Sequence, residues 1–212
     1  MQKTVIIAGT TGLVGQALLR LAVADPTVET IYSVGRLPAP FSHPKIKSMV
    51  VDFSALAPMP GAQELYLALG TTIKVAGSQA AFRSIDLDAN LSLAQAAFKA
   101  GVRKVGLVSA MGANARSKVF YNRVKGELED ALALMGLDAL VLARPSLLLG
   151  NRLSLGQPVR RGETLGLALS KALGFLIPSN YKPIAAESVA RALWTTVPLS
   201  QGRTVLVSGA MQ

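Results

Sequence analysis

Cysteine is absent from this 212-residue chain, and histidine occurs once. The absence of thiols excludes disulfide bonds, thiolate metal ligands and cysteine nucleophiles. The single histidine, His43, lies between Ser42 and Pro44 in a proline-rich stretch that is typical of a surface loop. We therefore expect no metal site.

Long hydrophobic runs are also missing. No apolar stretch approaches the roughly 20 residues that a membrane helix needs, so we expect no membrane span. The apolar run at residues 4–8 is too short for a signal peptide and ends at a glycine, which favours a first β-strand. These observations together predict a cytoplasmic protein.

Aromatic and acidic residues are scarce. Aromatics make up 5% of the chain, and 12 acidic residues face 22 lysines and arginines, for a formal net charge of +10. Such a charge suits nucleic acid as well as smaller anions, but single-stranded nucleic acid needs aromatic side chains beside the charges. Because the aromatics are few and the basic residues are scattered, we expect no nucleic-acid partner and favour a phosphorylated small molecule.

Hydrophobic residues make up half of the chain, which is enough for a sizeable core. Short apolar runs alternate with helical patterns, as is typical of βαβ units and a parallel sheet. The expected strands are 4–8, 30–34, 47–51, 64–69, 104–109, 139–143 and 204–208, and the expected helices are 13–24, 78–100, 117–135, 165–173 and 186–197. The sequence thus predicts an α/β fold: a doubly wound parallel (Rossmann) sheet with helices on both faces. We expect one domain over residues 1–212, with a small C-terminal cap at 151–183.

A glycine-rich turn follows the first expected strand. It reads GTTGLVG and consists of Gly9, Thr10, Thr11, Gly12, Leu13, Val14 and Gly15. Gly9 allows a tight turn, Gly12 lets backbone N–H groups approach a pyrophosphate, and Gly15 lets the next helix pack close to the strand. The helix start also offers N–H donors and a partial positive charge to phosphate. The turn therefore predicts a bound dinucleotide, with all seven residues as candidate ligands.

The end of the second expected strand favours NADP(H) over NAD(H), and the ends of the third and fourth strands add further candidate ligands. NAD-binding domains often place an acidic residue at the end of the second strand to hold the ribose 2′-OH. Arg36 stands there instead, and its guanidinium suits a 2′-phosphate, so we expect NADP(H). Asp52, with Phe53 beside it, ends the third strand and is placed to accept a hydrogen bond from the adenine amino group. The fourth strand ends in four further candidates, Leu69, Gly70, Thr71 and Thr72.

Three residues carry candidate chemistry. Tyr121 and Lys125 are four positions apart and share one face of an expected helix. A lysine ammonium lowers the pKa of a nearby phenol from its usual value of about 10, so such a tyrosine can exchange a proton with a substrate oxygen. Ser109 ends a strand, where open α/β sheets bind ligands, and its hydroxyl is a candidate to hold the substrate carbonyl. The alternative is an ordinary helix face without catalytic function.

These motifs resemble those of the atypical branch of the short-chain dehydrogenase/reductase family, most closely its Tat-interactive-protein-like oxidoreductase group. The resemblance spans about residues 1–150 and includes VSAMGAN at 108–114, FYNRVKGELE at 120–129 and ARPSLLLG at 143–150. It implies bound NADP(H), Ser109, Tyr121 and Lys125 as the catalytic set, and Pro145 against the nicotinamide. One feature departs from the family pattern: Asn90 is the only candidate for the asparagine that holds a proton-relay water in many members, and its spacing to Ser109 is shorter than usual.

Two functions remain open. The first is an NADP(H)-dependent oxidoreductase that reduces a carbonyl or an activated alkene, with Tyr121 as acid/base and Lys125 also holding the cofactor. The second is an NADPH-binding, redox-sensing regulatory protein with little turnover, whose partner distinguishes the two cofactor states. Nucleotide-sugar epimerisation is disfavoured, because the chain after residue 150 is short for a substrate domain.

The C-terminal third carries two further expectations. Its basic residues either line the mouth of a pocket for an anionic small-molecule substrate or keep the surface hydrated. These residues are Arg152, Arg160, Arg161, Lys171 and Lys182. The apolar segment 164–177 favours a buried or subunit-contacting helix, and with it a homodimer.

Overall fold

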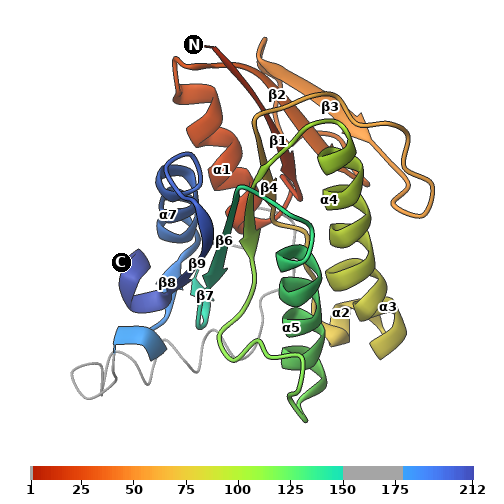
Figure 1. Ribbon diagram of the computed structural model, residues 1–212, viewed down its shortest axis with the longest axis vertical. Coiled ribbons are helices and arrows are strands. Elements are labelled where there is room, and N and C mark those ends of the chain that lie inside the picture. Colours follow the sequence, from red (N-terminus) through yellow and green to blue (C-terminus); the bar gives the residue numbers. More distant parts are fainter. Residues whose placement is uncertain (1, 150–178) are drawn as a thin grey trace.

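The computed structural model describes residues 2–149 and 179–212. Its centre is a seven-stranded sheet with the order β3-β2-β1-β4-β5-β6-β9, in which all neighbouring strands are parallel (Figure 1). The strands are β1 (Lys3–Ala8), β2 (Val28–Gly35), β3 (Ile46–Val50), β4 (Glu64–Leu67), β5 (Lys104–Val108), β6 (Ala139–Arg144) and β9 (Gly202–Val207). The chain winds outward from β1 in both directions, so the expected doubly wound Rossmann-type sheet is confirmed.

Helices cover both faces of this sheet. α1 (Leu13–Ala24) and α7 (Ala186–Thr196) pack on one face, while α4 (Asn90–Lys99) and α5 (Phe120–Ala133) pack on the other (Figure 1). Each helix has one apolar stripe at the spacing of a helix face. In α5, for example, Val124, Leu128 and Leu132 are fully buried. These stripes explain why the helices lie flat on the sheet.

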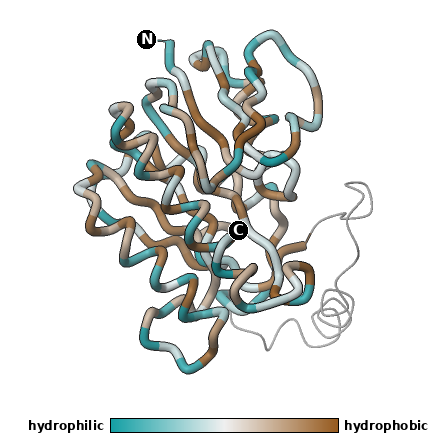
Figure 2. The backbone as a smooth tube through the Cα atoms, turned by 90° about the vertical axis from the view of Figure 1, so that its right-hand side faces the viewer, coloured by the Kyte–Doolittle hydropathy of each residue, from teal (hydrophilic) through white to brown (hydrophobic). Residues whose placement is uncertain are grey.

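The sheet has a separate hydrophobic core on each face. Along β1, Ile6 and Ala8 belong to the core under α4 and α5, whereas Val5 and Ile7 belong to the core under α1 and α7. A strand buried on both faces needs apolar residues at successive positions, which is why residues 5–8 form a continuous apolar run. Figure 2 shows hydrophobic colour concentrated along the central strands and hydrophilic colour on outer turns.

Most expected elements are found, with informative differences. Helix α1 has the expected bounds, but the expected helix 78–100 consists of α3 (Gln79–Arg83), a π-helical segment η1 (Ser84–Ala89) and α4. The short helix α2 (Ile73–Ala76) and the strand pair β7 (Leu148–Leu149) and β8 (Ile184–Ala185) were not expected. The expected helix 165–173, the apolar segment 164–177 and most of the cap 151–183 lie outside the described residues. In the described part, the cap contains only the 3₁₀ turn η3 (Ser179–Tyr181), and a second 3₁₀ turn, η4 (Ser208–Met211), ends the chain.

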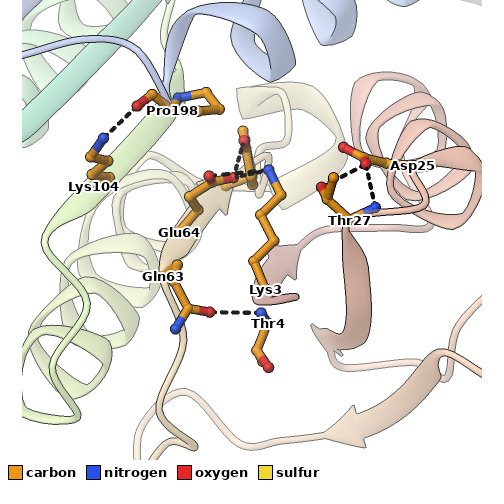
Figure 3. Close-up of polar contacts among 9 residues, drawn as sticks. Lys3, Thr4, Asp25, Thr27, Gln63, Glu64, Lys104 and Pro198 are labelled. Atoms are coloured by element: carbon orange, nitrogen blue, oxygen red, sulfur yellow. Dashed lines mark hydrogen bonds and ion pairs between the residues drawn. The ribbon is translucent and has the colours of Figure 1, made fainter. Parts of the chain in front are cut away.

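The amino ends of the strands are closed by a buried polar cluster. Lys3 Nζ lies 3.1 Å from Glu64 Oε1 and Oε2, and Tyr66 donates its hydroxyl to Glu64 Oε2 at 2.7 Å. Burial, followed by the Glu64 charge, raises the pKa of Tyr66 well above its usual value. Figure 3 shows this end of the sheet, including the hydrogen bond from Thr4 N to Gln63 Oε1 at 2.7 Å. These contacts fix the end of the sheet opposite the candidate site.

Within residues 2–149 and 179–212, no helix combines the length and the apolar character that crossing a bilayer requires.

Candidate functional site

A cavity of about 1140 Å³ lies at the carboxyl ends of the central strands. Loops after β1, β2, β3 and β4 contribute to its wall, together with the end of β5, segment η1, helix α5 and Leu148. Fifteen of the candidate residues line it: Gly9, Thr10, Thr11, Gly12, Leu13, Val14, Arg36, Asp52, Phe53, Leu69, Gly70, Thr71, Ser109, Tyr121 and Lys125. The other three candidates, Gly15, Thr72 and Pro145, are not lining residues. The fold therefore gathers at one edge of the sheet residues that are widely separated in the sequence.

The glycine turn is shaped by close backbone approach. Gly9 has a φ of +77°, and a Cβ there would lie 2.5 Å from the Ala68 carbonyl oxygen at the end of β4. A Cβ on Gly15 would lie 2.1 Å from the Gly9 carbonyl oxygen, so only glycine lets α1 start this close to β1. Thr10 Oγ1 and Ser33 Oγ share a buried hydrogen bond of 2.7 Å that ties the turn to β2.

Helix α1 begins inside this turn at the N-cap Gly12. A glycine N-cap has no side chain with which to satisfy the first N–H groups, and the first turn contains no acidic residue. The helix N-terminus therefore has the partial positive charge that suits a phosphate group. The turn, the close strand–helix approach and the helix start fit a dinucleotide.

The ends of β2 and β3 contribute two oppositely charged side chains. Arg36 is exposed and lines the cavity. The Asp52 carboxylate accepts hydrogen bonds from Ser54 N at 2.9 Å and Ser54 Oγ at 2.7 Å. These two bonds, the backbone one first, lower the pKa of Asp52, so it is a carboxylate at neutral pH.

The end of β4 leads into α2 through a helix cap. Thr72 Oγ1 accepts a hydrogen bond from Val75 N at 3.2 Å, and Gly77 ends the helix with a φ of +85°. The Thr72 side chain is thus engaged in capping α2. Its neighbour Thr71 lies at the cavity wall instead, where its backbone N–H donates to Asp86 Oδ2 at 2.8 Å.

A buried ion pair lies beside Tyr121. Lys125 Nζ is 2.7 Å from Asp86 Oδ1, and both side chains are almost completely buried. Burial alone disfavours the charged amine, but the charges of Asp86, Tyr121 and Glu129 outweigh it, so the pKa of Lys125 is raised. Sequence reasoning missed Asp86. The available signal was an acidic residue on an otherwise apolar helix face. A 3.6-residue periodicity does not reveal this signal, because the π-helical turn changes which residues face inward.

Asn90 is fully buried just after the π-helical segment. Its Nδ2 lies 3.2 Å from the Ile85 carbonyl oxygen, 3.3 Å from that of Asp86 and 3.4 Å from that of Leu69. Its Oδ1 has no hydrogen-bond partner in the part of the chain that the structure describes. Asn90 therefore stabilises the widened turn that contains Asp86.

Ser109 faces a different partner from the one expected. Its hydroxyl donates to Glu129 Oε1, and Glu129 is buried on α5 two turns beyond Tyr121. Arg144 binds both oxygens of Glu129, through Nε at 3.0 Å and through Nη2, while Arg203 Nη2 lies 3.2 Å from Oε2. Bonding to Glu129 raises the pKa of Arg144. For Ser109 to hold a substrate carbonyl, its hydroxyl must turn away from Glu129.

The loop after β5 packs directly on the start of α5. A Cβ on Gly126 would lie 2.1 Å from Ala115 N, and Asn114 N donates to the Asn122 carbonyl oxygen at 3.0 Å. On the other side, Met111 N donates to the Pro145 carbonyl oxygen at 2.9 Å. Pro145 therefore supports the loop beside the cavity through its carbonyl group.

The arrangement combines the glycine turn, a phenol and an ammonium held by an ion pair in one cavity, a combination that suits proton transfer beside a dinucleotide. In residues 2–149 and 179–212, no group of three histidine, cysteine, aspartate or glutamate side chains could hold a metal ion.

Sequence relatives identify the family. No protein-family model matches the chain. A protein from Candida albicans named "Protein FMP52, mitochondrial" is 34% identical over 198 residues, which cover 87% of this chain and 83% of that protein. The FMP52 protein of Debaryomyces hansenii is 31% identical over 209 residues, covering 92% and 89%. Several such relatives are named as mitochondrial proteins, so the expectation of a cytoplasmic protein is wrong.

Solved structures share the fold. MoeE5 in complex with UDP-glucose and NAD has a TM-score of 0.72 at 16% identity, covering 96% of this chain and 75% of that one. The Bordetella bronchiseptica enzyme WbmG in complex with NAD has a TM-score of 0.68 at 12% identity, covering 99% and 74%. At such identities the likeness establishes the fold alone. The chain belongs to the FMP52 family and has a Rossmann fold.

Proposed function

We propose that this protein is an NADP(H)-dependent oxidoreductase that reduces a carbonyl or an activated alkene of a small molecule. The observation that carries the proposal is that Tyr121 and Lys125 line the same cavity as the glycine turn. The NAD complexes of fold relatives support a nicotinamide dinucleotide in this cavity. The cofactor, when bound, supplies the hydride, and the protein supplies orientation and a proton.

Each polar residue has a separate role in this proposal. Tyr121 donates its phenolic proton to the substrate oxygen, or accepts one in the reverse direction. Lys125, fixed by Asp86, holds the nicotinamide ribose and stabilises the phenolate. Ser109 orients the substrate once its hydroxyl leaves Glu129. The backbone of the glycine turn and the start of α1 bind the pyrophosphate.

The catalytic assignment is tested with Tyr121→Phe. This variant is expected to retain its affinity for NADPH and to lose turnover by about 100-fold or more on any substrate found, because it removes only the proton donor. A panel of carbonyl and alkene compounds, with NADPH oxidation as the readout, provides the substrate. Undiminished turnover in the variant contradicts the assignment.

The preference for the 2′-phosphate is a finer proposal that rests on Arg36. The guanidinium is exposed at the cavity, in the position where many NAD-binding domains have an acidic residue. Arg36→Gln is expected to weaken NADPH binding by about 10-fold while leaving NADH binding unchanged, since only NADPH has the second phosphate. Arg20→Gln, which removes the same charge from an exposed position on α1, is the control. Equal losses for NADPH and NADH contradict the 2′-phosphate role.

A second candidate function is a redox-sensing regulatory protein with little turnover. It is favoured by the Ser109–Glu129 hydrogen bond, which occupies the hydroxyl that a reductase needs for its substrate. This function predicts saturable NADPH binding without turnover across the compound panel, and a partner whose affinity differs between NADP⁺ and NADPH. Turnover of any panel compound that depends on Tyr121 contradicts it.

Three finer expectations stay predictions: the narrower grouping with Tat-interactive-protein-like oxidoreductases, the homodimer and an anionic substrate. Sedimentation of the purified protein tests the homodimer.

A further inference from the structure

The hydroxyl of Ser109 connects the cavity to a buried carboxylate. Ser109 lines the cavity, whereas Glu129 on α5, which accepts the Ser109 hydroxyl proton, is buried and is not a lining residue. A ligand in the cavity therefore meets Ser109 and not Glu129. Any influence of Glu129 on the ligand must pass through the serine hydroxyl.

Two arginines hold Glu129 from neighbouring strands. Arg144 on β6 donates to Oε1 through Nε at 3.0 Å and to Oε2 through Nη2, while Arg203 on β9 donates to Oε2 through Nη2 at 3.2 Å. A guanidinium that binds both oxygens of a carboxylate fixes the orientation of that carboxylate as well as its charge. Glu129 therefore keeps Oε1 available to Ser109.

This arrangement determines which hydrogen bonds Ser109 can still form. A serine hydroxyl has one proton to donate and two lone pairs that accept. The proton is given to a charged acceptor, and such a bond is roughly twice as strong as one between neutral groups. Within residues 2–149 and 179–212, no other side chain forms a hydrogen bond with Ser109 Oγ. Ser109 thus offers its lone pairs to a ligand, and these need a ligand that donates.

Carbonyl and hydroxyl ligands make different demands on this serine. A carbonyl oxygen only accepts, so it bonds to Ser109 only when the hydroxyl turns away from Glu129 and the charge-assisted bond is lost. An alcohol has its own O–H group, which donates to Ser109 Oγ while the bond to Glu129 stays in place. The hydrogen bonds then run in one direction, from the ligand through Ser109 to Glu129.

We propose that Glu129 is a positioning residue that makes Ser109 a hydrogen-bond acceptor, so that the cavity binds a secondary alcohol more tightly than the ketone of the same carbon skeleton. The inference deepens the proposed function and rests on it for its consequence: the alcohol formed by reduction is retained as a product inhibitor and is accepted as the substrate of the reverse oxidation by NADP⁺. The binding preference itself needs neither cofactor nor turnover.

The test measures the binding of isopropanol and acetone to the cofactor-free protein. The two probes share a carbon skeleton, and only isopropanol has an O–H group. Each is titrated while the backbone amide resonance of Ser109 is followed by NMR. We expect isopropanol to bind about 10-fold more tightly, because it leaves one charge-assisted hydrogen bond intact. Acetone that binds as tightly as isopropanol, or a Ser109 resonance that does not respond to isopropanol, overturns the proposal.

Two variants and a control separate this effect from packing. Ser109→Ala removes the acceptor, so both probes are expected to bind equally. In Glu129→Gln the amide oxygen stays with the two guanidinium groups and the NH₂ group donates to Ser109, whose own proton is then free for acetone, so the preference for isopropanol is expected to be lost or reversed. Glu127→Gln makes the same change on the same helix, at a partly exposed pair with Arg83, and is expected to keep the preference.

Each variant also has an outcome that contradicts the proposal. An unchanged preference in folded Glu129→Gln shows that Glu129 has only a structural role, and an unchanged preference in Ser109→Ala shows that the serine does not cause it; either result overturns the proposal. If Glu129→Gln does not fold, the original protein and Ser109→Ala still decide the outcome. Failure of the protein to bind NADPH refutes the proposed function and leaves these titrations unaffected, because they contain no cofactor.

Discussion

Replacing Gly15 by alanine tests whether close backbone approach determines the shape of the glycine turn. The new Cβ would lie 2.1 Å from the Gly9 carbonyl oxygen and 2.6 Å from its carbon. Both are backbone atoms of a turn held by the hydrogen bond from Gly12 N to the Gly9 oxygen, at 2.9 Å. No side-chain rotation can relieve this contact, so the start of α1 must move by about 1 Å to reach ordinary van der Waals separation.

Two effects of opposite sign determine how much Gly15→Ala changes the free energy of unfolding. Alanine in a helix interior is favoured over glycine by about 1 kcal/mol, whereas overpacking a well-packed site costs about 1–3 kcal/mol or more. Because the Gly15 contact is with backbone, the larger cost applies, and we expect a net loss of about 2 kcal/mol in the free energy of unfolding. For a chain of this size, that loss lowers Tm by about 4–8 °C.

Thermal unfolding of Gly15→Ala beside Gly12→Ala measures the effect. A Cβ on Gly12 would meet the same Gly9 oxygen at 3.3 Å, which a small adjustment relieves. We therefore expect Gly12→Ala to change stability by less than about 1 kcal/mol, and Gly15→Ala to weaken NADPH binding as well as stability. A Tm for Gly15→Ala equal to or above the original refutes the reasoning from close approach.

Three further substitutions address the polar clusters and the loop on α5. Glu129→Gln breaks a buried ion pair with Arg144, whose guanidinium reaches solvent, so we expect the free energy of unfolding from chemical denaturation to fall by about 2–3 kcal/mol. An unchanged denaturation midpoint argues against a structural role for Glu129. The folded-state pKa of Tyr66 is raised above its unfolded-state value of about 10, so the protonated phenol contributes stability that is fully present below pH 10 and is lost as the pH rises through the folded-state pKa. Tyr66→Phe should therefore flatten the fall of Tm with alkaline pH. An equally steep fall of Tm in the variant points to another group. Gly126→Ala places a Cβ 2.1 Å from Ala115 N and should cost about 2 kcal/mol in thermal unfolding, and wild-type stability would show that the loop moves freely.

Local patterns were sufficient to predict the fold and the place of the cavity. The glycine turn, the apolar strands and the Tyr121–Lys125 spacing each depend on neighbours within one or two helical turns, and such patterns predict elements well. The carboxyl ends of parallel strands meet at one edge, so Arg36, Asp52 and Thr71 could be assigned to one cavity before the structure was known.

The partners of the buried charges depended on the tertiary structure. In the sequence, Asp86 is an acidic residue in an expected helix, and Ser109 is a hydroxyl at the end of a strand. The π-helical turn directs Asp86 toward Lys125, and the packing of α5 brings Glu129 to the Ser109 hydroxyl. A buried charge is stable only when it has a partner. Here that partner comes from a distant segment of the chain, and local sequence patterns do not predict how that segment is oriented. The sequence by itself therefore determined the sheet, the turn and the candidate chemistry, whereas tertiary packing decided which polar groups hold each other in place.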